Sequence, residues 1–115
     1  MGVLLSTGAL TIYHCGDTEY DVRLRRLKSR EPDVALLCIN GITGNMDAHE
    51  AALMAWHLRA STVVPIHHHL WAVTTGTAEE TLNPDLFVKT YGRLGGSGKA
   101  LIPAIGGEID LVRRV

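Results

Sequence analysis

The sequence predicts a single layered α/β domain built on a mixed sheet. Two apolar runs carry this prediction, DVALLCI at 33–39 and STVVPIH at 61–67, the second ending as a strand at Pro65. Each run is continuously apolar rather than alternating, as expected for strands that are buried on both faces of a sheet. Helical patterns precede, separate and follow them, and alternating strands and helices favour a layered sheet. The predicted order is ββ-α-β-α-β-α-ββ.

The first predicted elements are a β-hairpin and an amphipathic helix. GVLLSTGALTIYH, at 2–14, contains two β-prone runs that are joined at residues 6–8. In YDVRLRRLKS, at 20–29, apolar residues recur at helical spacing opposite a basic face. Pro32 ends this helix. We expect its basic face to be solvated.

A Gly-rich loop and a well-marked helix separate the two apolar runs. The loop is NGITGN at 40–45, and the helix follows over 46–60. Asp47 and Glu50 have the spacing of a capping box, in which each side chain accepts a backbone N–H at the start of the helix. This helix is therefore the most strongly specified one in the chain.

The C-terminal part predicts one more helix and a second hairpin. The helix covers 82–94 and starts after Asn83, where proline occupies the first helical position. Residues 98–105 and 108–115 are β-prone and flank a Gly-Gly turn, which favours a hairpin.

Composition and charge exclude several classes of protein. At 115 residues, with 46% hydrophobic and 20% charged residues, the chain is one small globular domain. A net charge of −1 gives no electrostatic case for a nucleic-acid or membrane partner. No apolar run approaches the roughly 18 to 20 residues that span a bilayer, and the N-terminus does not match a signal peptide, so we expect a cytoplasmic protein. Cys15 and Cys38 are expected to be buried, reduced thiols.

Two polar residues stand directly after predicted strands. Asp17 follows LTIYH, and His67 follows TVVPI. Ligands of open α/β sheets bind beyond strand carboxyl ends, so these side chains fit one site if their strands are close together. Carboxylate and imidazole suit Zn, Mn or Fe. Each also has a structural interpretation, Asp17 as an Asx turn or helix N-cap, and His67 with His68 and His69 as an exposed turn.

Other candidate motifs do not meet their chemical requirements. HEAAL at 49–53 lacks the second histidine of the HExxH zinc motif, and GGSGKA at 95–100 lacks the first glycine and the Ser/Thr of a phosphate-binding loop. No GxSxG nucleophile elbow occurs. His57 shares a predicted helical face with Leu53 and Met54, where we expect a satisfied core histidine.

Three stretches taken together resemble one family. They are TIYHCGDTEYD at 11–21, DVALLCINGITGNMDAHEAALMAWHL at 33–58 and TVVPIHHHLW at 62–71. In this order they are similar to the C-terminal half of a metallo-β-lactamase-fold hydrolase, in the branch of L-ascorbate-6-phosphate lactonase. That branch carries HxGDT/S after a strand, a DVAL strand, an NM…EA helix and a VIPxH strand. The resemblance implies that residues 1–115 form one half of an αββα sandwich.

The resemblance also implies roles for individual residues. Asp17 would be the catalytic carboxylate that bridges two metal ions, and His67 would ligate one of them. His14 would support the site from outside the ligand set, and Asn45 and Met46 would lie near it on the substrate side. The implied cofactor is a divalent metal, Mn or Zn, with two ions in the complete fold.

The implied reaction is hydrolysis by a metal-bound hydroxide, in which an ester, lactone or phosphoester is cleaved. Small-molecule substrates such as a sugar-acid lactone follow from the lactonase-like branch. The HxHxDH motif that supplies further ligands in the family is absent from the chain. Because two ligands do not make a tight metal site, we expect the isolated chain to be inactive. It would be a fragment, a split subunit or a truncated product, completed by a partner chain or a homo-oligomer.

Two alternatives to a hydrolase stay open at this point. The chain could be a non-catalytic α/β module that acts by association through an exposed sheet edge. It could also be a simple histidine-cluster metal binder, in which His68 and His69 matter as much as His67. A partner chain bearing HxHxDH favours the hydrolase, and a stable metal-free monomer favours the association module.

Overall fold

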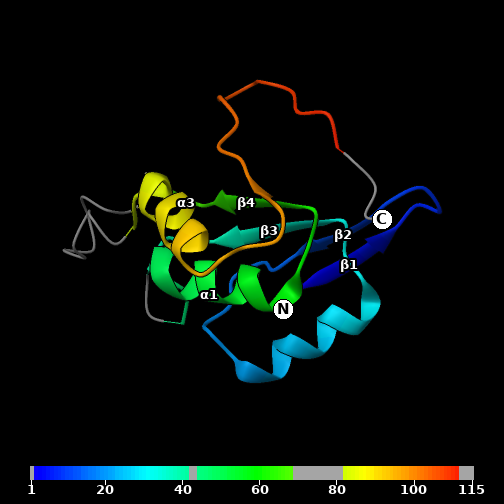
Figure 1. Cartoon of the computed structure of the whole chain (residues 1–115), viewed down its shortest axis with the longest axis horizontal. Helices are drawn as coiled ribbons and strands as arrows, with labels where there is room; N and C mark the ends of the chain where they lie inside the picture. Colours follow the sequence, from blue (N-terminus) through cyan, green and yellow to red (C-terminus); the bar gives the residue numbers. More distant parts are fainter. Residues whose placement is uncertain (1, 42–43, 69–81, 112–115) are drawn as a thin grey trace.

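The computed structural model describes residues 2–41, 44–68 and 82–111. Within these ranges the chain forms a five-stranded sheet in the order β1-β2-β3-β4-β5, with helices packed against it (Figure 1). The strands are β1 (Val3–Ser6), β2 (Thr11–His14), β3 (Val34–Cys38), β4 (Thr62–Ile66) and β5 (Lys99–Ala100). The helices are the 3-10 helix η1 (Val22–Arg30) and the α-helices α1 (Ala48–Leu58) and α3 (Pro84–Arg93). The predicted α/β class with a mixed sheet is confirmed.

The topology places the carboxyl ends of β2, β3 and β4 next to one another at one end of the sheet. β1 and β2 form the predicted antiparallel hairpin, whereas β2, β3, β4 and β5 are all parallel. Spatial order equals sequence order, so each crossover connection advances by one strand. The segments that follow β2, β3 and β4 therefore all leave the sheet at the same edge, where ligands of α/β sheets usually bind.

The core lies between the sheet and α1. This helix contacts β3 and β4 and packs between η1 and α3. Its small residues, including the fully buried Ala51, Ala52 and Ala55, allow close approach to the sheet. The predicted helix signals are confirmed: Asp47 and Glu50 form a capping box, and Asn83 caps α3. No helix in the described residues is long and apolar enough to cross a membrane.

Pro65 occupies the middle of the sheet, where proline is rare because it cannot donate a ladder hydrogen bond. It pairs with Leu37 of β3 on one side. On the other side β5 pairs only with Thr62 and Val63, so the neighbouring strand has ended before Pro65. Because β5 is so short, no strand lies beside Pro65 on that side to need its missing N–H, and proline is tolerated in this central strand.

Two predicted elements differ in the structure. The segment after β2 is a 3-10 helix rather than an α-helix, and none of its residues is fully buried, so packing does little to enforce regular α geometry. The C-terminal hairpin is wrong for the described residues, because only Lys99–Ala100 is a strand and residues 101–111 contain none. Backbone N–H groups of Lys99 and Leu101 donate instead to Ser61 and Val63 of the β4 segment. Long-range parallel pairing therefore replaces the local hairpin. The last four residues of the predicted hairpin, 112–115, lie outside the described residues.

Gly98→Ala is expected to destabilise the fold markedly. A Cβ atom at Gly98 would lie 2.1 Å from the backbone oxygen of Ala60, which forces β5 away from β4. Gly92, inside α3, has nothing within 4 Å of such an atom. Gly92→Ala should therefore stabilise the protein by about 0.5–1 kcal/mol, because alanine favours the helix. Urea unfolding of both variants checks the pair, and equal stability of the two would contradict the predicted packing at Gly98.

Candidate functional site

Asp17 and His67 meet at the edge where the parallel strands end. Asp17 Oδ1 lies 3.4 Å from His67 Nδ1, and the two side chains are 72% and 34% exposed. Asp17 follows β2 and His67 directly follows β4, with β3 between these strands. The two residues are thus brought together by two loops that reach across the end of β3. The prediction of a single site depended on this proximity, which the sequence alone could not establish.

The backbone on both sides of this contact is in the left-handed region. Gly16, directly before Asp17, has φ 62°, and His67 itself has φ 61°. For a non-glycine residue this conformation costs roughly 1–2 kcal/mol, so the surrounding fold must hold it. The Gly16 N–H donates to His14 Nδ1 at 3.0 Å. His14 therefore orders the turn that presents Asp17, and the structure shows no direct contact between His14 and that carboxylate.

The segment before α1 approaches Asp17 from a third direction. Asn45 Nδ2 lies 3.5 Å from Asp17 Oδ1, which is the long limit of a hydrogen bond. The neighbouring residue, Met46, is fully buried, and its N–H donates to the Thr18 carbonyl at 3.0 Å. Met46 thus fastens the helix start to the Asp17 loop, and Asn45 lies at the site as a consequence.

Asn40 is a polar residue at this edge that sequence reasoning missed as a site candidate. It lies just beyond β3 and is only 5% exposed. Its side-chain oxygen has no hydrogen-bond partner within the described part of the chain. Such buried, unpaired oxygens are uncommon and call for a physical explanation. Its position in the sequence could have identified it as a site candidate. Asn40 directly follows a buried strand, and this strand lies between the strand that leads to Asp17 and the strand that leads to His67.

The two cysteines lie beneath the Asp17 loop and are buried free thiols, as predicted. The Cys38 N–H donates to Cys15 Sγ at 3.1 Å. The hydrogen bond between the two thiols, together with burial, raises the pKa of Cys15. The same hydrogen bond from Cys15 lowers the pKa of Cys38 to about 6. The pair links the carboxyl ends of β2 and β3 below the site.

His49 and His57 contact other residues than Asp17. His49 Nδ1 lies 3.2 Å from Thr90 Oγ1, between α1 and α3. His57 is half-buried rather than a core histidine, so that expectation is wrong; its ring meets Trp56 edge-on at 5.0 Å. The reason is that the face of α1 carrying His57 turns toward η1 and solvent. His68 is half-buried, and His69 lies outside the described residues.

The donor set fits part of a metal site. Two ligands that each lie about 2.1 Å from one tetrahedral ion are separated by roughly 3.4 Å, which matches the separation of Asp17 and His67. The same distance is longer than a usual N–H···O hydrogen bond. The described residues contain no group of three or more His, Cys, Asp or Glu side chains that could hold an ion. Asp17 and His67 would therefore supply two donors of a larger set.

The fold and the site define a class of protein: an α/β sheet that presents a carboxylate and an imidazole together at the ends of parallel strands. Residues 2–67, which include both side chains, match the β-lactamase superfamily domain. The chain belongs to this superfamily. The predicted family is thereby confirmed at the superfamily level, and the lactonase branch stays a prediction.

Two proteins of similar sequence agree with this assignment. The UPF0173 metal-dependent hydrolase of Anaeromyxobacter sp. strain K is 37% identical over 83 residues, which cover 70% of this chain and 30% of the relative. A second UPF0173 metal-dependent hydrolase, from Geobacillus sp. strain WCH70, is 34% identical over 111 residues, and the match covers 44% of that relative. The chain therefore spans less than half the length of these relatives.

Solved structures show the same relation. A metallo hydrolase from the archaeon Ignicoccus hospitalis superposes with a TM-score of 0.74 at 27% identity, over 93% of this chain and 43% of that protein. The metallo-β-lactamase-fold protein YhfI of Bacillus subtilis matches with a TM-score of 0.66 at 19% identity, over 88% of this chain and 39% of that one, and supports the fold alone. The family implies a divalent metal.

Proposed function

We propose that this chain supplies the Asp17–His67 part of the metal site of a metal-dependent hydrolase. The observation that carries the proposal is the 3.4 Å separation of Asp17 Oδ1 and His67 Nδ1 at the carboxyl edge of the parallel strands. A hydrolase is favoured because the relatives that match the chain are described as metal-dependent hydrolases. Asp17 would be the catalytic, metal-bridging carboxylate, and His67 a terminal ligand.

Each neighbouring residue has a definable task in this proposal. Asp17 is mostly exposed, so its second oxygen is accessible to a further ion or ligand. Asn45 restrains the first oxygen, and His14 fixes the turn before it. A bound divalent metal would supply an activated water and Lewis-acid stabilisation of the developing negative charge. Carboxylate and imidazole suit both Mn and Zn, and we propose one of these two.

We further propose a lactonase-like activity on a small ester, lactone or phosphoester, such as a sugar-acid lactone. This rests on the similarity of the three sequence stretches to the lactonase branch. The Asp17 side chain is mostly exposed and the His67 side chain partly exposed, which fits a small-molecule substrate that binds at this end of the sheet.

The site needs further donors from outside the described residues, and we propose that a further segment or partner chain, or a second copy, completes the sandwich. β1 is an edge strand, and its Val3 and Leu5 side chains are 61% and 54% exposed. Exposed apolar residues on a sheet edge are typical of an association surface. This surface is available to the completing part of the fold.

The isolated 115-residue chain is expected to show no hydrolase turnover. Two metal donors hold an ion too weakly for a working binuclear centre. Lactone and phosphodiester hydrolysis would be measured with added Mn²⁺ or Zn²⁺, before and after addition of a chain bearing HxHxDH. Turnover that appears only in the mixture, and is lost in Asp17→Ala, supports the proposal. A mixture that associates stably yet takes up no metal would favour a non-catalytic association module instead.

A further inference from the structure

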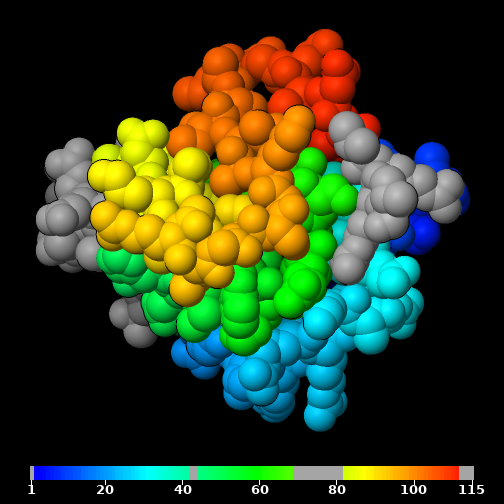
Figure 2. Space-filling model, viewed as in Figure 1, coloured from blue at the N-terminus to red at the C-terminus, as the bar shows by residue number. Residues whose placement is uncertain are grey.

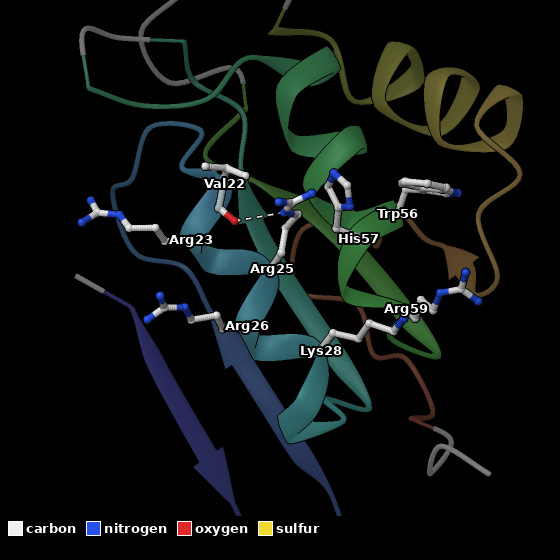
Figure 3. Close-up of a pocket in the computed structure, with 8 residues that line it drawn as sticks. All are labelled: Val22, Arg23, Arg25, Arg26, Lys28, Trp56, His57 and Arg59. Carbon is white, nitrogen blue, oxygen red and sulfur yellow. Dashed lines mark hydrogen bonds between the residues drawn. The ribbon is translucent and has the colours of Figure 1, made fainter.

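A concave region lies between η1 and the end of α1, and neither Asp17 nor His67 lines it (Figure 3). It has a volume of about 600 Å³. The residues that line it are Val22, Arg23, Arg25, Arg26, Lys28, Trp56, His57 and Arg59. We call it the basic hollow. In Figure 2 the two segments that form it, η1 in blue and cyan and α1 in green, lie side by side on the surface.

The basic hollow concentrates positive charge that the chain as a whole does not have. It contains five of the eleven Lys and Arg residues of a chain whose net charge is −1. No carboxylate of the described residues lines it. Arg23 is paired with Asp21, whose carboxylate lies 2.6 Å from its guanidinium. Among the described residues, Arg25, Lys28 and Arg59 form no ion pair, so their charges are available to an anion.

The side chains that line the basic hollow come from two elements that are distant in sequence. In Figure 3 the Arg25 guanidinium lies beside the His57 ring, and the Lys28 side chain extends toward Arg59, whose guanidinium points away from η1. The Arg25 Nε–H donates to the Val22 carbonyl at 3.2 Å, which restrains the stem of this side chain. Arg59 ends α1 with φ 55°, and this left-handed cap turns the chain sharply at the hollow.

Aromatic rings form one wall of the basic hollow. Trp56 and His57 contact each other edge-on at a centroid distance of 5.0 Å, and both are half-buried. Burial, together with the nearby Arg25 cation, lowers the pKa of His57, which favours the neutral imidazole. A neutral imidazole can exchange hydrogen bonds with a ligand without adding charge. The indole offers an apolar surface beside the cations.

We propose that the basic hollow binds a small organic phosphate with at least two negative charges and a planar ring, as in a nucleoside diphosphate. The phosphates would lie beside Lys28 and Arg59, because guanidinium forks and ammonium groups bind phosphate oxygens strongly. The ring would lie against Trp56, as bases stack on aromatic side chains. The small size of the hollow and the net charge of −1 favour a small ligand over a nucleic-acid polymer.

This site is independent of the proposed hydrolase centre. Asn45 and Met46 approach Asp17 from the start of α1, whereas Trp56, His57 and Arg59 belong to its end. The two ends of the eleven-residue helix α1 lie roughly 15 Å apart along the helix axis. Failure of the metal proposal would therefore leave the anion proposal standing, and the reverse also holds.

Calorimetric titration of the full chain in EDTA tests the proposal, with inorganic pyrophosphate, adenosine diphosphate and adenosine as probes. We expect both phosphates to bind, the nucleotide more tightly, and adenosine alone to bind at least tenfold more weakly. Lys28→Gln and Arg59→Gln should each weaken binding of both phosphates about tenfold, because each removes a charge-assisted hydrogen bond. Trp56→Leu should weaken binding of the nucleotide and leave pyrophosphate unchanged.

The matched control is Lys89→Gln on α3, which removes the same charge from an exposed position outside the hollow. It should leave all affinities unchanged, and circular dichroism should show the same fold in every variant. An equal loss of affinity in Lys89→Gln would reveal non-specific charge attraction and overturn the proposal. So would absence of phosphate binding, or tighter binding of a single-stranded oligonucleotide than of the nucleotide.

Discussion

Asp17→Ala and His67→Ala are each expected to abolish metal uptake by the assembled protein, that is, the chain together with the part that completes its donor set. Each substitution removes one donor of the pair separated by 3.4 Å, and loss of a donor from a small ligand set weakens binding steeply. Elemental analysis of the purified assemblies, after dialysis against metal-free buffer, measures the expected loss. His57→Ala serves as the control, since its ring lies in the basic hollow.

The control decides between a specific site and general disruption. His57→Ala should keep its metal and lose some stability, because only the contact with Trp56 is removed. If all three variants lost metal equally, the assignment of Asp17 and His67 as ligands would be contradicted. If His67→Ala kept its metal while Asp17→Ala lost it, His67 would be a neighbour of the site and not a ligand.

Phe87→Ala is expected to destabilise the chain by about 3–5 kcal/mol, the usual cost of a large cavity in a core. Phe87 is fully buried on α3, where its ring stacks on Tyr91 at a centroid distance of 6.3 Å. A small domain has only about 5–15 kcal/mol of total stability, so this variant should lie close to unfolding at 25 °C. Urea denaturation followed by circular dichroism measures the change.

Leu94→Ala, just past the end of α3, provides the comparison for Phe87. Its side chain is 38% exposed, so its removal leaves no buried cavity and should cost less than about 1 kcal/mol. Similar denaturation midpoints for the two variants would contradict the packing of α3 on the core described above.

Local signals in the sequence predicted most of the fold. The continuous apolar runs became β3 and β4 because both faces of these strands are covered, and Asp47, Glu50 and Asn83 capped the helices that their side-chain chemistry favours. The second hairpin failed because its first strand found a distant partner: Lys99 pairs with Thr62 of β4. Local β-propensity does not indicate whether a strand pairs with its neighbour in the sequence or with a distant strand.

The candidate site was predictable in its residue types and not in its geometry. Asp17 and His67 were identifiable as polar residues after strands, but their contact depends on the left-handed turns at Gly16 and His67. Asn40 was missed because a buried polar atom without a partner is a property of tertiary packing. The basic hollow was missed for the same reason, since Arg59 meets η1 only when α1 packs against it.

Paramagnetic NMR on the chain tests most directly whether Asp17 and His67 share one ion. Addition of Mn²⁺ at low molar ratios should broaden the backbone signals of Asp17, Asn45 and His67 first, and Asp17→Ala should remove this broadening. Signals of Trp56 and Arg59 should stay sharp, because they lie at the far end of α1. Broadening that begins elsewhere, or that persists unchanged in Asp17→Ala, would contradict the proposed metal site.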